Sequence, residues 1–201
     1  MFKKYLLLLG ILFLGFGHPA TGLSETPKST IEQSVNQVLS ILQDPKYKPE
    51  DQKEAQRKVI WTKAHELFDF YEMSQRTIGK YWPKLKPQEK EQFSDLFARF
   101  LSNIYYSKLE QYTNEKIQFL NEKMQTNEKA IVQTTIITAT AEIPMDYSLI
   151  LKDGIWKVYD VNIEGVSLVR NYRTQFNQIL SKNNISELIN RLKTKLGRFV
   201  N

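Results

Sequence analysis

Cysteine is absent from the 201 residues of the chain. A disulfide framework is therefore excluded, even if the protein reaches an oxidising compartment. Stability must come from a packed core instead, and a chain of this length can bury one of sufficient size. The sequence also lacks internal repeats, low-complexity tracts and linkers, which predicts a single domain.

Residues that carry catalytic chemistry are scarce. The chain has two histidines, His18 and His65, and neither belongs to a metal-binding motif or a glycine-rich phosphate loop. His65 lies four residues before Asp69, a spacing that brings side chains together on a helix. A histidine and a carboxylate without a nucleophile are only a weak indication of catalysis. We therefore expect no enzyme, no catalytic residue, no metal and no cofactor.

Neither sign of charge dominates the sequence. Lys and Arg number 28 against 22 Asp and Glu, which gives a formal charge of +6. Nucleic-acid binders concentrate basic residues on one face or in a tail, whereas here the two signs alternate through almost every segment. We expect no nucleic-acid partner. The mildly basic surface suits weak docking on acidic partners or anionic membranes.

Only one long apolar run is present, from Tyr5 to Phe16. It follows Lys3-Lys4 and precedes the small residues Ala20-Thr21-Gly22, which is typical of a secretory signal peptide over residues 1–22. The alternative is a membrane anchor, but twelve helical residues reach about 18 Å against roughly 30 Å of hydrocarbon. We expect cleavage near Leu23, which leaves one mature domain over residues 23–201.

Helical spacing dominates the first half of the mature chain. Thr30 is placed to cap a first helix that ends at Asp44, and a second begins at Pro49. Asp69 followed by Glu72 predicts a capping box at the start of a third helix. That helix is expected to end at residues 81–83.

The longest predicted helix begins at Pro87. Lys86 stands before it, so the helix lacks the side-chain cap that Ser or Thr would supply, at a loss of about 1 kcal/mol. Its apolar face is wider than a simple packing stripe and is rich in aromatic residues, namely Phe93, Leu96, Phe97, Phe100, Leu101, Ile104, Tyr105, Leu109 and Tyr112.

Strand patterns follow from residue 117 onward. Residues 117–120, 130–141 and 143–151 are rich in β-branched and apolar residues, and the last segment alternates as in a sheet with one buried face. Lys152-Asp153-Gly154 predicts a hairpin turn. The next strand begins near Trp156, and Gly165 leads it into a helix that starts at Val166; a final helix uses residues 185–196.

Two segments together resemble the MlaC family, also called toluene-tolerance auxiliary proteins. They are FDFYEMSQRTIGKYWPKLKPQEKEQFSDLFARFL, from Phe68 to Leu101, and WKVYDVNIEGVSLVRNYRTQFNQIL, from Trp156 to Leu180. The resemblance extends over essentially the whole mature chain. It implies an α+β protein whose helices pack against a curved antiparallel sheet related to the nuclear transport factor 2 fold and enclose a hydrophobic lipid cavity.

The same resemblance implies a function. Family members are periplasmic carriers that hold a glycerophospholipid as cargo and shuttle it between the outer and inner membranes, which maintains outer-membrane lipid asymmetry. The implied partners are an outer-membrane lipoprotein and porin complex and an inner-membrane ABC transporter with an MCE-domain subunit. We expect a monomer located in the periplasm.

Apolar residues on the long helix, the sheet and the helix after Gly165 form the predicted lipid-binding set. Each one taken singly is more often core than cavity lining, but their collective excess is informative. The set comprises Phe93, Phe97, Phe100, Leu101, Ile104, Tyr105, Tyr147, Leu149, Val161, Ile163, Val166, Leu168, Val169, Tyr172 and Phe176.

Two alternatives stay open at the level of sequence. A periplasmic chaperone, or a binder of other hydrophobic molecules, would need the same apolar composition.

Around the strand-to-helix junction, four polar residues are more readily explained as turn, cap and ion-pair residues than as lipid contacts. They are Asp160, Glu164, Ser167 and Arg173. The remaining basic residues near these segments could instead meet phosphate or an acidic partner, namely Arg170, Lys80, Lys84 and Lys86.

Overall fold

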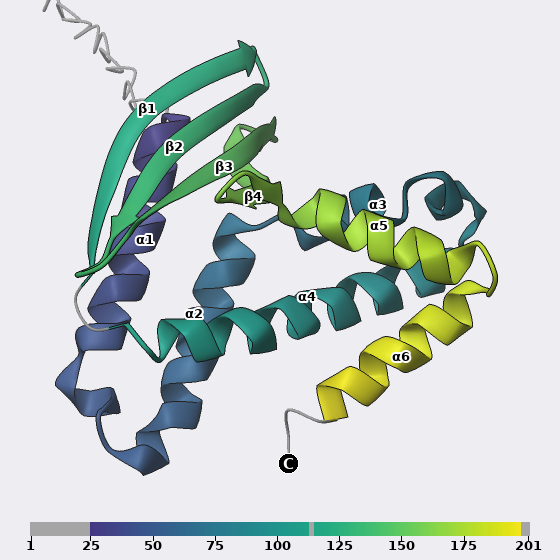
Figure 1. Cartoon of the computed structure of the whole chain (residues 1–201), viewed down its shortest axis with the longest axis horizontal. Coiled ribbons are helices and arrows are strands. Elements are labelled where there is room, and N and C mark those ends of the chain that lie inside the picture. The colour runs from purple at the N-terminus through teal and green to yellow at the C-terminus, as the bar shows by residue number, and fades with distance from the viewer. Residues whose placement is uncertain (1–24, 113–114, 198–201) are drawn as a thin grey trace, which may run out of the picture.

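The computed structural model describes residues 25–112 and 115–197. The predicted signal peptide, residues 1–22, lies outside the described residues. The chain runs from two N-terminal helices to a helical group, then through a sheet, and returns to the helical group (Figure 1). In the part of the chain that is described, no helix combines the length and the apolar character that a bilayer crossing requires.

Five antiparallel strands form a single sheet in the order β1-β2-β3-β4-β5. Their bounds are Lys116–Thr126, Lys129–Ile137, Glu142–Lys152, Ile155–Ile163 and Val166–Ser167. The predicted turn between β3 and β4 is confirmed, because Asp153 and Gly154 both have positive φ, 51° and 79°, as a two-residue hairpin of this kind requires. Bulges in β1 and β4 add local twist to the curved sheet.

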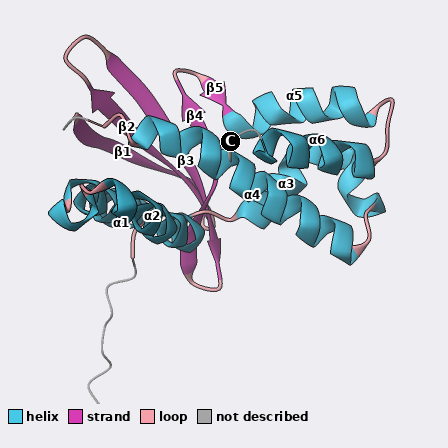
Figure 2. Ribbon diagram, turned by 90° about the horizontal axis from the view of Figure 1, so that it is seen from below, coloured by secondary structure: helices cyan, strands magenta, loops and turns pink. Residues whose placement is uncertain are grey.

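One face of the sheet packs against the first two helices. α1 spans Pro27–Gln43 and α2 spans Lys53–Leu67, and the short 3₁₀ turns η1 (Pro45–Tyr47) and η2 (Glu50–Gln52) connect them. Figure 2 shows both helices on the same side of the strands. The buried side chains between them form what we call the sheet core: Ile31, Leu67, Ala130, Val132, Leu149, Trp156, Val158 and Val161.

The other helices build a separate group beside the sheet. It contains α3 (Phe70–Ile78), η3 (Gly79–Lys84), α4 (Pro87–Leu109), α5 (Leu168–Leu180) and α6 (Ile185–Gly197). Their buried side chains form the helical core: Met73, Ile78, Trp82, Phe93, Phe97, Phe100, Leu101, Val169, Tyr172, Phe176, Leu180, Ile185, Leu188, Ile189 and Leu192. The predicted α+β class, with helices against a curved antiparallel sheet, is confirmed.

The start of α1 differs from the prediction. Thr26, not Thr30, caps the helix, because its hydroxyl accepts a hydrogen bond from the Ser29 N–H at 3.1 Å. Pro27 then occupies the first turn, where its fixed φ and missing N–H are tolerated. Thr30 is buried inside the helix, and its own hydroxyl donates to the Thr26 carbonyl.

The starts of α3 and α4 agree better with the sequence. Asp69 accepts from the Glu72 N–H at 2.8 Å, as predicted, but its own N–H donates to the Val158 carbonyl, so Glu72 does not complete a capping box. Lys86 supplies no side-chain cap to α4. The Glu89 carboxylate accepts from the Lys86 N–H at 2.8 Å instead.

The connection at Gly165 is a second tight hairpin, which the sequence prediction missed. Glu164 and Gly165 both have positive φ, 50° and 83°, and the chain then pairs back on β4 through Val166 and Ser167. Val166 therefore belongs to β5, and the helix begins at Leu168 rather than at Val166. Glycine tolerates this backbone conformation without steric cost.

Candidate functional site

The two cores do not merge into one. α4 packs against α3 and α6 and has no extensive contact with any strand. Phe68, at the end of α2, is the half-buried residue that packs against both cores. We call the region between the cores the seam. Its remaining members are half-buried apolar residues, Ile104 and Tyr105 on the helical side and Phe119, Met145, Tyr147, Ile163 and Leu168 on the sheet side.

The register of the sheet brings the strand members of the seam together. Met145 pairs with Ile163, Phe119 pairs with Thr134, and Thr134 pairs with Met145, so their side chains share one face. Tyr147 lies two residues along β3 on that same face. This face therefore continues beyond the part covered by α1 and α2 and presents apolar side chains toward α4.

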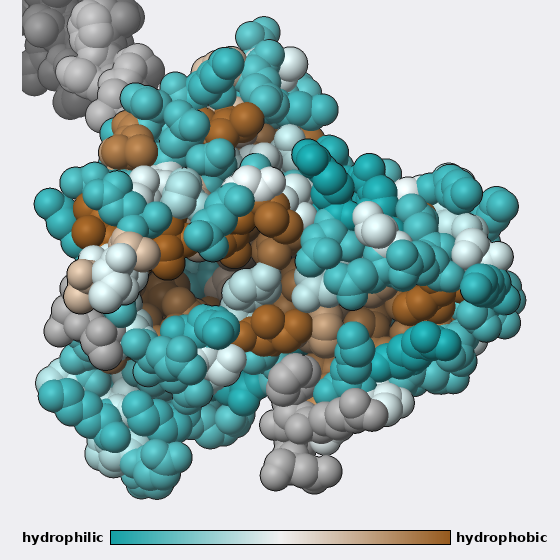
Figure 3. Space-filling model, viewed as in Figure 1, coloured by the Kyte–Doolittle hydropathy of each residue, from teal (hydrophilic) through white to brown (hydrophobic). Residues whose placement is uncertain are grey.

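A hollow opens on the surface at this place. Figure 3 shows it between the sheet and α4, with hydrophobic residues in brown around its rim and within it. Apolar side chains left in contact with water are unfavourable by about 25 cal/mol per Å². A concave site with an apolar lining is the usual form of a site for an apolar ligand.

The structure divides the predicted lipid-binding set into four groups. Leu149 and Val161 are buried in the sheet core. Val166 is 56% exposed. The half-buried members at the seam are Ile104, Tyr105, Tyr147, Ile163 and Leu168, and those buried in the helical core are Phe93, Phe97, Phe100, Leu101, Val169, Tyr172 and Phe176.

The aromatic members of the helical core pack closely on one another. Phe97 makes edge contacts with Tyr172 and Phe176 at ring-centroid distances of 5.3 and 5.4 Å, and Phe93 stacks on Phe97 at 5.9 Å. Such pairs stabilise a core beyond the area that they bury. The half-buried seam residues, unlike these packed rings, keep free apolar surface. Contact of the whole set with a lipid stays a prediction.

Three residues of the seam were not in the predicted set. Phe119 and Met145 lie in predicted strands, and Phe68 is the first residue of a segment that resembles the MlaC family. Met145 stands two residues before Tyr147, so the alternation of β3 already places it on the same face. Phe119 alternates with Ile117 in β1 in the same way. Phe68 could not be found by spacing, because its position depends on how α2 meets the sheet.

Tyrosines are the only titratable members of the seam among the residues described. Burial raises the pKa of Tyr147 to about 12 and also raises the pKa of Tyr105. Tyr172, at the edge of the helical core, has its pKa raised to about 12 by burial, with a further contribution from Tyr105. These hydroxyls therefore stay protonated and neutral at physiological pH, and the site offers dry apolar surface with neutral hydrogen-bond donors.

Polar contacts tie the helical group to the sheet beside the seam. The Asp69 N–H donates to the Val158 carbonyl at 2.9 Å, and Lys152 Nζ lies 2.6 Å from Asp69 Oδ2 and 3.0 Å from Glu72 Oε2. The Arg76 guanidinium lies 4.1 Å from the Tyr159 ring centroid. The two cores are thus joined at this edge while the seam itself stays apolar.

Asp160 organises the start of α5. Its carboxylate accepts from Ser167 Oγ at 2.6 Å and from the Val169 N–H at 3.0 Å, while Ser167 Oγ accepts from the Arg170 N–H at 3.0 Å. Arg173 donates from Nε to the Arg76 carbonyl at 2.6 Å. The contacts of Asp160, Ser167 and Arg173 agree with their interpretation as cap and junction residues.

The residues considered for catalysis do not come together. His65 Nδ1 lies 3.1 Å from the Trp61 carbonyl, and its ring packs against Trp61 and Phe70. Asp69 is instead engaged by Lys152 and by the Glu72 N–H. In the part of the chain described, no three His, Cys, Asp or Glu residues are grouped as a metal site would require.

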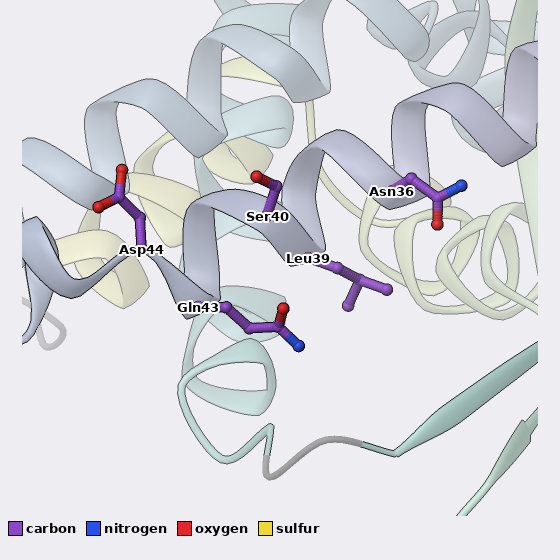
Figure 4. Close-up of a pocket in the computed structure, with 5 residues that line it drawn as sticks. All are labelled: Asn36, Leu39, Ser40, Gln43 and Asp44. Atoms are coloured by element: carbon purple, nitrogen blue, oxygen red, sulfur yellow. The ribbon is translucent and has the colours of Figure 1, made fainter.

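Two shallow pockets lie elsewhere on the surface. One, of about 440 Å³, is lined by Asn36, Leu39, Ser40, Gln43 and Asp44 along α1 (Figure 4). The other, of about 630 Å³, lies at the turn between α5 and α6. Their linings are mostly polar, so neither suits a long apolar ligand.

Known proteins share both the sequence pattern and the fold. The chain is 24% identical over 197 residues to the intermembrane phospholipid transport system binding protein MlaC of Haemophilus influenzae, a match that covers 95% of this chain and 92% of that protein. It is 28% identical over 105 residues to the toluene tolerance protein ttg2D of Pseudomonas putida, which covers 52% of this chain and 49% of that protein.

A solved structure agrees with the description of the fold. The phospholipid-binding protein of Ralstonia solanacearum, determined in complex with a phospholipid, superposes with a TM-score of 0.72 at 23% identity, and the match covers 87% of this chain and 98% of that one. The family model described as MlaC protein matches residues 32–194. Because that match covers most of the sequence, this chain belongs to the MlaC family.

Proposed function

We propose that this protein is a periplasmic carrier that binds a glycerophospholipid and moves it between the outer and inner membranes. The observation that carries the proposal is the seam, with half-buried apolar side chains that belong to two separate cores, together with the apolar hollow between the sheet and α4 (Figure 3). Acyl chains inserted there would join the two cores into one continuous apolar interior. The names of the Haemophilus influenzae and Ralstonia solanacearum proteins support this choice of ligand.

The energetics explain why such a carrier must take its cargo from a membrane. Each CH₂ group left in water costs about 0.8 kcal/mol, so two chains of about 16 carbons amount to roughly 25 kcal/mol. Real affinities saturate near 18 to 21 kcal/mol. In a bilayer the chains are already dry, so transfer into the seam is close to balanced. Partners must then impose the direction.

The proposal includes the partners and the location. A signal peptide over residues 1–22 would deliver one mature domain, 23–201, to the periplasm. There it would meet an outer-membrane lipoprotein and porin complex and an inner-membrane ABC transporter with an MCE-domain subunit. The formal charge of +6 on the whole chain suits encounters with acidic surfaces. Binding rather than catalysis fits the separation of His65 from Asp69.

Lipid loading from vesicles tests the proposal. Delipidated protein is incubated with phosphatidylglycerol vesicles and re-isolated, and its bound phospholipid is quantified by mass spectrometry. We expect about one lipid per chain. Ile163→Glu should lower that amount at least tenfold, because a carboxylate in a dry site carries a desolvation penalty of several kcal/mol.

Ile155→Glu is the matched control for this experiment. Ile155 lies on the same strand, β4, but is 53% exposed and pairs with Lys152. It should load like the wild type. A folded Ile163→Glu protein that loads fully would contradict the seam as the binding site. Failure of the wild-type protein to load any phospholipid, together with a co-purifying client polypeptide, would favour a chaperone instead.

A further inference from the structure

Tyr105 lies on the helical side of the seam, and Tyr172, buried in the helical core, is close enough to interact with it electrostatically. Tyr105 lies on α4, one turn beyond the buried Leu101, and Tyr172 lies in the first turns of α5. The Tyr172 ring is held by Phe97, Phe100 and Phe176, with centroid distances between 5.3 and 5.7 Å. Its orientation is therefore fixed by packing, and its hydroxyl is carried to a defined position.

Neither hydroxyl has a hydrogen-bond partner among the described residues. Tyr172 is only 8% exposed, yet its oxygen is not one of the fully buried polar atoms without a partner. It therefore keeps access to open space although its ring does not. A buried tyrosine usually finds a partner for its hydroxyl, so the unpaired hydroxyl of the buried Tyr172, with that of the half-buried Tyr105 near it, indicates a ligand atom as the missing acceptor.

The residues around the two hydroxyls indicate which kind of ligand atom would accept their hydrogen bonds. The two tyrosines are close enough to interact electrostatically, and burial is the main influence on both. Among the described residues no lysine or arginine is hydrogen-bonded to either hydroxyl; Lys195 Nζ lies 5.5 Å from the centroid of the Phe100 ring, which packs against Tyr172. A phosphate would need a cation to offset its desolvation in such a place, whereas a neutral carbonyl oxygen needs only a donor. Burial also keeps both hydroxyls protonated, as a donor must be.

We propose that the Tyr105 and Tyr172 hydroxyls donate hydrogen bonds to the ester carbonyls of the diacylglycerol part of the cargo, so that the protein prefers ester-linked over ether-linked lipid. This inference rests on the proposed function, since it assigns a subsite within the same lipid site. The protein then recognises its cargo by the linkage between the acyl chain and glycerol. It does not recognise the headgroup.

A competition between two lipids tests this assignment. Delipidated protein is incubated with vesicles that contain equal amounts of dipalmitoyl phosphatidylglycerol and its dihexadecyl ether analogue, and the two bound species are quantified by mass spectrometry. We expect the wild type to prefer the ester, by about fivefold for each hydroxyl, which is the typical net value of one hydrogen bond. Tyr105→Phe and Tyr172→Phe should each lower the ratio, and the double variant should bring it close to one.

Tyr106→Phe is the matched control. Tyr106 is the next residue on α4, but its hydroxyl lies 3.5 Å from the Lys53 carbonyl, away from the seam. This variant should keep the wild-type ratio. An ester-to-ether ratio near one in the wild type, or an unchanged ratio in the double variant, overturns the inference. Equal losses of both lipids in the variants would mean that the hydroxyls bind the phosphate instead, which also overturns it.

The outcome separates this inference from the proposed function. A wild-type protein that loads both lipids equally is still a phospholipid carrier but does not distinguish the ester linkage from the ether linkage. A wild-type protein that loads neither lipid contradicts the carrier function itself, and the ester subsite falls with it.

Discussion

At the scale of single residues, two tyrosines in apolar surroundings, Tyr147 and Tyr172, make stability sensitive to alkaline pH. The pKa values of Tyr147 and Tyr172 are raised to about 12 by burial, against about 10 for an unperturbed tyrosine. Above pH of about 10 the unfolded chain therefore loses these protons while the folded chain keeps them. Their contribution to stability is complete below that pH and is lost as the pH rises toward about 12.

Tyr172→Phe should reduce this alkaline loss. The fall in unfolding free energy between about pH 9 and pH 11.5 should be smaller than in the wild type by about 2 kcal/mol, because one pKa unit corresponds to about 1.4 kcal/mol. Urea denaturation at the two pH values measures it. Tyr71→Phe serves as the control, since Tyr71 is 46% exposed. An equal alkaline loss in Tyr172→Phe and in the wild type would count against a raised pKa for Tyr172 in the folded state.

At the scale of elements, the junction between β4 and α5 depends on Asp160. Removing its carboxylate leaves the Val169 N–H and the Ser167 hydroxyl without their partner. Asp160→Ala should lower the unfolding free energy by about 1 to 3 kcal/mol, as measured by urea denaturation. Asp95→Ala, which removes an exposed ion pair with Arg99 on α4, should change it by less than about 1 kcal/mol. Equal effects of the two substitutions would contradict the role of Asp160.

Several elements followed from the sequence because their determinants are local. Pro87 begins α4 and Asp153-Gly154 turns β3 into β4, since each requirement involves only adjacent residues. Two predictions were wrong because a neighbouring residue offered a second, equally local explanation. Thr30 was a plausible cap, but Pro27 makes Thr26 the better one. The Glu164-Gly165 hairpin was missed because the apolar spacing of α5 extends back to Val166, although that residue pairs with β4.

The candidate site was harder to predict because it depends on which element covers which face. The aromatic face of α4 was visible in the sequence, but α3, α5 and α6 cover most of it, which leaves Ile104 and Tyr105 half-buried. The sequence also left open which side of the sheet Val158 and Val161 face. A bulge at Tyr159 places both valines on the inner face although they are three residues apart.

At the scale of the whole molecule, the division of the interior into two cores is the central feature. A globular protein of this size usually has one contiguous core, and here the helical group and the sheet each have their own. The edge contacts from Asp69, Arg76 and Lys152 hold the two parts together beside the seam. Under the proposed function, acyl chains would enter between the two parts without unfolding either of them.

Native mass spectrometry of the protein purified from the periplasm without detergent tests this account most directly. The account predicts a mass greater than that of the polypeptide by one glycerophospholipid, and release of that lipid by organic solvent. A protein that carries only its polypeptide mass, and that takes up no lipid when offered vesicles, would contradict it.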